Sequence, residues 1–460
     1  MDTVAAETSL NAAQGEEQDH YAEHLADVNK DIDVVATEDI VNKNGVLIAK
    51  KGACIDHAAA KRLVQHKLSR PLEQQVQLSD SIDTSGMYAS WLQMMRKYPD
   101  LAHMHTELGF EQDYQSVLTS LDSHPLIAQK LTILARQMPQ WFDKALFCAW
   151  LAALVVREMG LDEATMRAAM MASLSHDVGF LHIDPQIVAK RDALTPEEWR
   201  SIQAHVIIGQ LFLTDIPGMD ERVPNAVLEH HERCDGTGYP FGKTGSDLAL
   251  LGKILGLADS LQAIRINQFA ARGCTLRDAM PYLQMNDFTY SMEVYRAAGN
   301  LLKKSGLRPA AINPYDGIRV WAQRLSSQCA LLREVNETLV LLQQILLENT
   351  VGEKRDGAVL MAVINNVIVK IASAGLAGDN ILQWLDSCSD DDENVLADLN
   401  EADLIVNELI WHVNHVHRTA EGYFDKEGDA GGIPSQARND MVKKVAAHIG
   451  RLRDLEQSKQ

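Results

Sequence analysis

The chain has few of the features that mark nucleic-acid-binding, membrane or secreted proteins. Basic residues are in the minority: 43 Lys and Arg face 63 Asp and Glu, so the formal net charge is −20. Broad basic surfaces are what bind a nucleic-acid backbone or anionic lipid. The charge therefore argues against a nucleic-acid polymer or a membrane as partner, while a local basic pocket for a small phosphate ligand stays compatible with it.

Long apolar runs and paired cysteines are also missing. No stretch reaches the roughly 18 apolar residues of a membrane span. The acidic start, MDTVAAETSLNAAQGEEQDH, has neither the basic residues nor the apolar run of a signal peptide. The six cysteines are scattered and form no CxxC pair, which is typical of reduced thiols. We therefore expect a cytoplasmic protein.

The rest of the chain has ordinary globular composition, with 46% apolar residues. Residues 1–29 are polar and acidic, and we expect a disordered tail. In residues 30–80, the runs VVATEDIV and GVLIAKKG flank Asn44-Gly45, a dipeptide that accepts positive φ and favours a hairpin. Helical and strand patterns follow, so this segment predicts a small α+β accessory module.

Helical patterns dominate the remainder. Within residues 88–310, the segment 141–160 is apolar on all sides and predicts a buried core helix. Residues 195–213 open with the residues of a capping box. Residues 311–460 are leucine-rich and helical. Their leucine stripes predict either core packing or a homodimer interface. His412 and His415, one turn apart, favour a helix surface over a metal site that would lack a third ligand.

Three short motifs between these patterns carry histidines and aspartates. Each has an ordinary explanation alone: a His-Asp pair arises by chance, a single histidine hydrogen-bonds within a helix, and a single aspartate caps one. Burying all six side chains without partners would cost much free energy of folding. The motif SHDVG holds His176 and Asp177, HHERCDGTGYP holds His230 and His231, and GLADSL holds Asp259. His205 lies between the first two motifs and completes the set.

Imidazole and carboxylate together suit Fe, Mn or Zn, and carboxylates can bridge two metals. Neighbouring residues on a helix point about 100° apart. Adjacent pairs such as His176-Asp177 and His230-His231 therefore fit two metals better than one. Bound metals of this kind activate water at neutral pH and offset charge on a phosphoryl group.

The motif HHERCDGTGYP resembles the signature of the HD-GYP proteins, a branch of the HD phosphohydrolases. Segments 173–199 and 256–261 resemble the family's HD segment and its later metal-binding aspartate segment, so the resemblance covers roughly residues 125–285. It implies an all-α domain with two divalent metal ions, iron or manganese, that hydrolyses the bacterial messenger cyclic di-GMP. The family's metal ligands fall on His176, Asp177, His205, His230, His231 and Asp259.

The resemblance also implies roles for these residues. His176 and Asp177 are the expected catalytic pair, with Asp177 bridging two metals that hold the attacking hydroxide. The product would be the linear dinucleotide or GMP. The Gly-rich loop 235–245 would shape the substrate mouth. The expected substrate contacts are Gly236, Gly238, Tyr239, Arg265 and Arg272.

Several positions depart from the family's pattern. A lysine that contacts substrate phosphate is replaced by Phe180, and an upstream metal-binding histidine by Lys144. A second aspartate is Gln262, and expected basic residues fall on Gln268 and Ala271. Because a hydrogen bond to a charged group contributes about 1.5–3 kcal/mol, these changes could lower catalysis by orders of magnitude.

We therefore predict a mainly all-α bacterial signalling protein. Residues 30–80 form its accessory module, residues 88–310 an HD-GYP-like phosphohydrolase domain, and residues 311–460 a helical region. The predicted function is metal-dependent hydrolysis of cyclic di-GMP, with a signalling protein as a further partner. Two alternatives stay open: a weak or inactive HD-GYP protein that serves as nucleotide sensor or scaffold, and a phosphohydrolase of another nucleotide.

Overall fold

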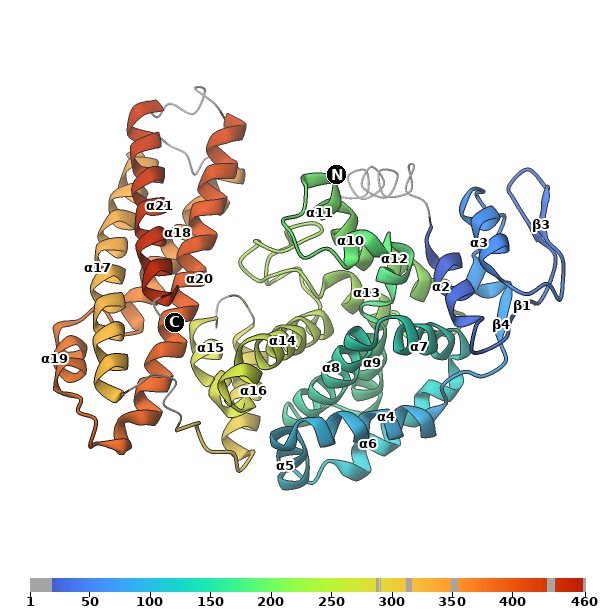
Figure 1. Ribbon diagram of the computed structural model, residues 1–460, viewed down its shortest axis with the longest axis horizontal. Coiled ribbons are helices and arrows are strands. Elements are labelled where there is room, and N and C mark those ends of the chain that lie inside the picture. The colour runs from blue at the N-terminus through green and yellow to red at the C-terminus, as the bar shows by residue number, and fades with distance from the viewer. Residues whose placement is uncertain are drawn as a thin grey trace. The chain divides into compact units, whose positions relative to one another are not determined.

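The computed structural model describes residues 19–286, 289, 291–311, 317–348, 355–427 and 435–457. The described chain is mainly helical with a few short strands, which confirms the predicted fold class (Figure 1). It divides into two compact units. The first holds the residues up to Arg233 with Gly238–Gln262 and Arg296–Gly306, and the second holds Cys234–Thr237, Ala263–Tyr295 and the residues from Leu307 onward.

A small α+β module begins the first unit, as predicted. Strands β2 (Ile40–Val41) and β3 (Leu47–Ala49) pair antiparallel, and Gly45 between them has a φ of 77°. Strand β1 (Val34–Ala36) pairs with β4 (Val76–Leu78), and helix α3 (His57–Val64) lies between them in the sequence. The Asn44-Gly45 hairpin is thereby confirmed.

Helix α2 (Tyr21–Val28) lies in the segment expected to be a disordered tail. The prediction is wrong for residues 19–29, and residues 1–18 lie outside the described part of the chain. Tyr21 and Leu25 are fully buried. Apolar side chains at helical spacing give α2 a buried face despite the acidic residues around it, and burial of that face stabilises the helix.

The helices of the first unit form the core behind the site. Helix α8 (Pro139–Glu158) is buried along most of its length and packs against α9 (Glu163–Ser175), which confirms the predicted core helix. Helix α11 (Pro196–Gln203) has the predicted capping box of Thr195 and Glu198. The other α-helices here are α4 (Thr84–Lys97), α5 (Pro99–Glu107), α6 (Glu111–Leu118), α7 (Pro125–Gln137), α10 (Pro185–Val188), α12 (His205–Thr214) and α13 (Arg222–Glu229), with most of α14 (Leu250–Ile264) and α16 (Met292–Lys304).

The second unit is a helical bundle around α17 (Ile318–Glu348). This helix packs against α18 (Arg355–Ser373), α19 (Asp379–Ser387), α20 (Leu396–Glu427) and α21 (Ser435–Gln457). Its leucines at 332, 339 and 346 are fully buried. Much of the leucine stripe therefore packs inside the chain. Among the described helices, none is both long and apolar enough to cross a membrane.

The second unit also takes residues that were expected in the HD-like domain. The bounds of the HD-like domain, 88–310, stay a prediction, and residues 263–295 belong to the second unit. The reason is a set of buried polar contacts with α20. Asn286, which follows α15 (Met280–Met285), donates to Glu408, and Asn400 of α20 donates to Asp278.

The predicted surface position of His412 is wrong. Its side chain is buried, and Lys370 Nζ donates to His412 Nε2 across 3.0 Å. A lysine on α18 thus supplies the partner that a buried imidazole needs.

Candidate metal centre

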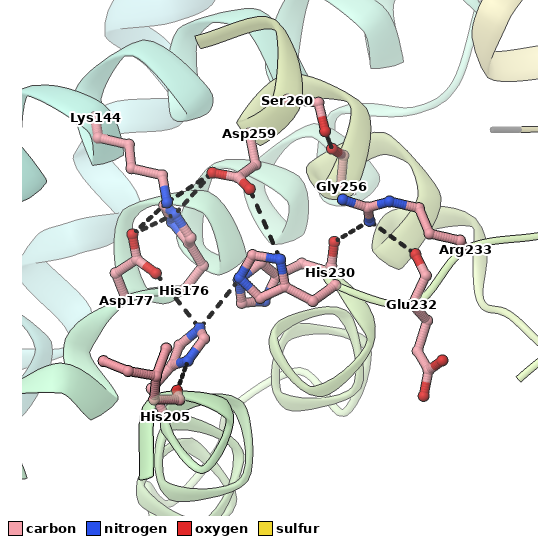
Figure 2. A network of polar contacts seen from close by, with 12 residues as sticks. Lys144, His176, Asp177, His205, His230, Glu232, Arg233, Gly256, Asp259 and Ser260 are labelled. Carbon is pink, nitrogen blue, oxygen red and sulfur yellow. Dashed lines mark hydrogen bonds and ion pairs between the residues drawn. The ribbon is translucent and has the colours of Figure 1, made fainter. Parts of the chain in front are cut away.

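The six predicted ligands, of which Figure 2 labels all but His231, come from helix ends and from one helix interior. His176 follows the last residue of α9, and Asp177 precedes the turn η3 (Val178–His182). His205 is the first residue of α12, and His230 and His231 follow α13. Asp259 lies within α14. The structure brings these residues together around one buried centre. Their role as metal ligands stays a prediction.

The distances at the centre are those of groups that face one another. His176 Nε2 lies 2.8 Å from Asp177 Oδ2, and His205 Nε2 lies 3.6 Å from Asp177 Oδ1. The Nε2 atoms of His205 and His230 are 3.4 Å apart. His231 Nδ1 lies 3.9 Å from Asp259 Oδ2. Two nitrogens that carry lone pairs gain nothing from such proximity unless a cation or a proton lies between them.

The other ring nitrogen of three histidines is fixed by the backbone. Nδ1 of His176, His205 and His230 lies 2.7, 2.6 and 2.6 Å from a carbonyl oxygen three residues earlier in the chain. Because a carbonyl only accepts, Nδ1 carries the proton and donates. In the neutral ring the lone pair is then on Nε2, which faces the centre. Metal-ligating histidines are oriented in this way.

Protonation states at the centre also suit metal binding. Burial lowers the pKa of His205 to about 4 and holds the pKa of His230 and His231 well below the ordinary value. These rings are therefore neutral at pH 7, as a ligating imidazole must be. Burial opposes ionisation of Asp177 and Asp259, but neighbouring charges outweigh it and lower the pKa of both carboxyl groups.

Lys144 of α8 lies among these ligands (Figure 2). Its Nζ is 2.8 Å from Asp177 Oδ2 and 2.7 Å from Asp259 Oδ1. Burial opposes the ammonium, yet the charges of the two aspartates outweigh that effect and raise the pKa of Lys144 well above its ordinary value. The side chain is therefore a fixed positive charge at the centre.

The donor set fits a metal ion in part. Within the described residues, His176 Nε2, both Asp177 oxygens and Asp259 Oδ1 are buried without a well-aligned hydrogen bond, and such atoms are costly to bury unless a cation compensates them. The group His205, His230 and His231 offers three nitrogens within 4.8 Å of one another, which suits Fe, Mn or Zn. The carboxylate side already holds the ammonium of Lys144. Two further groups have the same spacing: His176 with Asp177 and His230, and Cys148 with His176 and Asp259.

Gly179 allows η3 to approach α12. A Cβ at this position would lie 2.1 Å from the carbonyl oxygen of His205, so no other residue fits without moving that helix. Gly238 likewise allows close contact beside the His230-His231 pair, since a Cβ at this position would lie 2.4 Å from the carbonyl oxygen of His231. Both glycines thus position ligands by allowing close backbone contact.

The Gly-rich loop is held by a carboxylate that the sequence analysis did not single out. Glu232 accepts hydrogen bonds from the backbone N–H groups of Phe241 (2.7 Å) and Lys243 (2.9 Å). Its position inside HHERCDGTGYP was the available signal. The loop brings the Tyr239 ring onto His231, with centroids 4.7 Å apart and planes at 24°. Tyr239 thus lies beside the centre, and its role as a substrate contact stays a prediction.

An aromatic stack stands where the family's phosphate-contacting lysine was expected. The ring of Phe180 lies parallel to His205, with centroids 4.1 Å apart. Trp141 packs against Phe180, with ring centroids 4.3 Å apart. Phe180 is buried, so it supports the His205 ring and brings no charge.

The remaining predicted substrate contacts stay predictions. Gly236 has a φ of 79°, in the left-handed region that favours glycine. Arg265 and Arg272 belong to the second unit, as does Gln268. There, the guanidinium of Arg272 forms an ion pair with Asp403.

Comparison with known proteins finds relatives for the segment that holds this centre. Residues 124–294 match the HD domain family. Cyclic di-GMP phosphodiesterase PA4108 of Pseudomonas aeruginosa is 30% identical over 162 residues, which are 35% of this chain and 38% of that protein. A cyclic di-GMP phosphodiesterase of Thermotoga maritima is 32% identical over 158 residues, 34% of this chain and 43% of that protein. The 3'3'-cGAMP-specific phosphodiesterase 3 of Vibrio cholerae is 32% identical over 111 residues, 24% of each chain.

Residues 124–294 are thus similar to an HD domain, and the segments shared with these relatives overlap proteins named as phosphodiesterases of cyclic dinucleotides. HD domains are metal-dependent, and the described residues include clusters able to hold a metal. The chain spans about two fifths of the length of the two cyclic di-GMP phosphodiesterases. A solved structure, Bd1817, an HDG"Y"P protein from Bdellovibrio bacteriovorus, covers 63% of this chain and 96% of its own at 15% identity, with a TM-score of 0.33. At that score the likeness supports no conclusion.

Proposed function

We propose that the chain is a metal-dependent phosphodiesterase that hydrolyses cyclic di-GMP in bacterial second-messenger signalling. The observation that carries the proposal is the convergence of four histidines and two aspartates in an HD domain, with three Nε2 atoms directed at one buried centre. The names of the two cyclic di-GMP phosphodiesterases support the substrate.

The residues of the centre suit phosphodiester hydrolysis. A bound divalent metal, iron or manganese in our proposal, would lower the pKa of a water ligand and offset charge on the phosphoryl group. Three histidines present Nε2 atoms whose orientation the backbone fixes. Asp177 is ionised at neutral pH because nearby positive charge lowers its pKa, so it can ligate an ion or accept a proton from water.

An aromatic surface beside the centre supports a nucleotide substrate. The ring of Tyr239 packs on His231, and Trp199 lies edge-on to Tyr239 with centroids 5.8 Å apart. Trp199 is 45% exposed. Aromatic side chains at such positions stack on nucleobases, each at about 1–3 kcal/mol. Tyr239 of the Gly-rich loop and Trp199 of α11 therefore offer a base-stacking surface next to the groups that would act on phosphate.

A second candidate function is nucleotide binding without turnover. The observation that favours it is the pairing of Lys144 with Asp177 and Asp259, since this ammonium takes up carboxylates that a metal would use. A third candidate is hydrolysis of a related cyclic dinucleotide, which the similarity to the Vibrio cholerae cGAMP phosphodiesterase supports.

Two further parts of the proposal concern the setting of the protein. We place it in the cytoplasm, which the six free cysteines support because disulfides are rare there. We also propose a homodimer through the second unit, with a signalling protein as a further partner. Leu341 and Leu347 of α17 are 49% and 62% exposed and support the dimer.

The proposal is tested by turnover of cyclic di-GMP under anaerobic conditions, with protein loaded with Fe(II) or Mn(II). Chromatography of the products should show the linear dinucleotide or GMP. The His230→Ala variant should lose the product, while His66→Ala, which removes an exposed histidine of the accessory module, should retain it. Binding of cyclic di-GMP without product would favour the sensor, and product from 3'3'-cGAMP alone would favour the third candidate.

A further inference from the structure

The side chain of Lys144 lies within the centre and contacts two of its carboxylates. Its side chain is 15% exposed, and its Nζ contacts one oxygen of Asp177 and one of Asp259 (Figure 2). The ring centroid of Trp141 lies 5.1 Å from the same Nζ, close enough for an attractive cation–π contact. Trp141 in turn packs on Phe180, which stacks on His205. The ammonium is thus held from both the carboxylate side and the aromatic side.

The ammonium occupies the position of a metal ion that would bridge the carboxylates of Asp177 and Asp259. Metal–carboxylate distances are about 2.0–2.2 Å, whereas Nζ lies 2.7 and 2.8 Å from the two oxygens. An ion bound to both oxygens on the side that faces the centre would occupy the space that the ammonium fills. It would also meet a positive charge that shares its ligands, in a buried site where repulsion is screened little.

The opposite side of the centre is formed by histidines. There, His205, His230 and His231 offer three ring nitrogens within 4.8 Å of one another. Three histidines with an open fourth position are a known ligand set for a catalytic divalent metal. Asp177 Oδ1, the second oxygen of this carboxylate, lies 3.6 Å from His205 Nε2 and can complete the set. This side therefore has ligands for one ion.

We propose that the ammonium of Lys144 takes the place of one divalent cation, so that the centre binds a single metal at His205, His230 and His231. The inference deepens the proposed function, since it rests on a metal centre at these residues. It replaces the two metals expected from the resemblance. The carboxylates of Asp177 and Asp259 are compensated by an internal charge instead of a second ion.

The test is the metal content of the full-length protein after reconstitution with Mn(II) and removal of free metal. The wild type should hold one Mn(II) per chain and show the six-line spectrum of an isolated Mn(II) ion in electron paramagnetic resonance. Lys144→His replaces the ammonium by a ligand, so this variant should hold two Mn(II) per chain. The two ions should then couple and weaken the six-line signal.

Two other variants keep the test decisive. Lys144→Met removes the charge without adding a ligand, and it should also admit a second Mn(II), because the two aspartates and His176 stay in place. Lys97→His makes the same replacement at an exposed lysine that pairs with Asp143, and it should leave the content at one. Circular dichroism and a thermal unfolding curve establish that each variant is folded.

Two results would overturn the inference: two Mn(II) per chain in the wild type, or no Mn(II) in a folded wild type. A content of one in every folded Lys144 variant would also contradict it, because the lysine would then not be what excludes the second ion. The stoichiometry is independent of turnover. One Mn(II) per chain without hydrolysis of cyclic di-GMP would support this inference and contradict the proposed phosphodiesterase activity.

Discussion

Three histidines at the centre are oriented by the helices that precede them. Each Nδ1 donates to a carbonyl in the last turn of a helix: α9 for His176, α11 for His205 and α13 for His230. Carbonyls in a last turn have no partner inside the helix. The histidines thus satisfy these carbonyls and fix their own tautomer in one contact. A histidine in mid-helix would find such carbonyls already bonded.

Gly179→Ala tests how closely the turn after Asp177 must approach α12. The added Cβ would lie 2.1 Å from the His205 carbonyl oxygen, and relief requires movement of backbone. We expect a loss of about 3 kcal/mol in unfolding free energy, with weaker metal binding. Gly422→Ala in α20 is the matched control, since nothing lies within 4 Å of its Cβ. It should be neutral or stabilise by up to about 1 kcal/mol. Equal effects of both substitutions in denaturant titrations would contradict this account.

At the scale of elements, a buried lysine joins α7 to the N-terminal segments. Lys130 Nζ lies 2.7 Å from His182 Nε2, 3.3 Å from the ring centroid of Tyr21 and 3.7 Å from Glu73 Oε1. Burial opposes the ammonium and lowers the pKa of Lys130, although Glu73 and Asp19 favour the charge. These contacts connect the accessory module and α2 with the turn η3 that follows Asp177.

Lys130→Met should therefore destabilise the first unit. Removing one partner of a buried ion pair costs about 3–5 kcal/mol, and we expect the lower end because methionine keeps part of the packing. Lys30→Met removes a lysine that is 62% exposed and pairs with Asp27, and it should cost under about 1 kcal/mol. Thermal unfolding of both variants measures the difference. A similar melting temperature for the two would show that Lys130 does not hold these elements.

The Gly-rich loop depends on its carboxylate anchor. Glu232→Ala removes the acceptor of two backbone N–H groups, those of Phe241 and Lys243. We expect KM for the dinucleotide to rise about tenfold or more, because two lost hydrogen bonds amount to roughly 1–3 kcal/mol, while metal content stays unchanged. Glu197→Ala, which removes an exposed carboxylate that pairs with Arg200, should leave KM unaltered. An unchanged KM in Glu232→Ala would mean that the loop does not position substrate.

At the scale of the whole molecule, the second unit carries a pH dependence of its own. Burial raises the pKa of Glu408 from 4.5 to about 7, although Asn286 and Lys370 oppose the shift. Between these values the folded state binds a proton that the unfolded state has released. The unfolding free energy should therefore fall as pH rises from about 4.5 to 7, by up to about 1.4 kcal/mol per pH unit.

Glu408→Gln should remove this slope and leave the variant more stable than the wild type above pH 7. Urea titrations at pH 5 and pH 8 give the comparison. Glu421→Gln, on the same helix with a side chain that is 51% exposed, should keep the wild-type slope. If Glu408→Gln kept it as well, another group would be responsible.

Local chemistry decided which features could be predicted from the sequence. The Asn44-Gly45 hairpin and the Thr195 capping box follow from neighbouring residues, and HHERCDGTGYP places its own histidines. The pairing of Lys144 could not be predicted, because its two partners come from segments remote in the sequence. The buried hydrogen bonds of Asp278 and Asn286 with α20 could not be predicted for the same reason.

The most direct measurement is the rate of cyclic di-GMP hydrolysis as Mn(II) is added stepwise to metal-free protein, with bound metal measured at each step. The account predicts a rate that rises in proportion to bound Mn(II) and saturates at one ion per chain. Protein that holds its full metal content and yields no linear dinucleotide or GMP would contradict the phosphodiesterase. A rate that appears only as a second ion binds would contradict the single-metal centre.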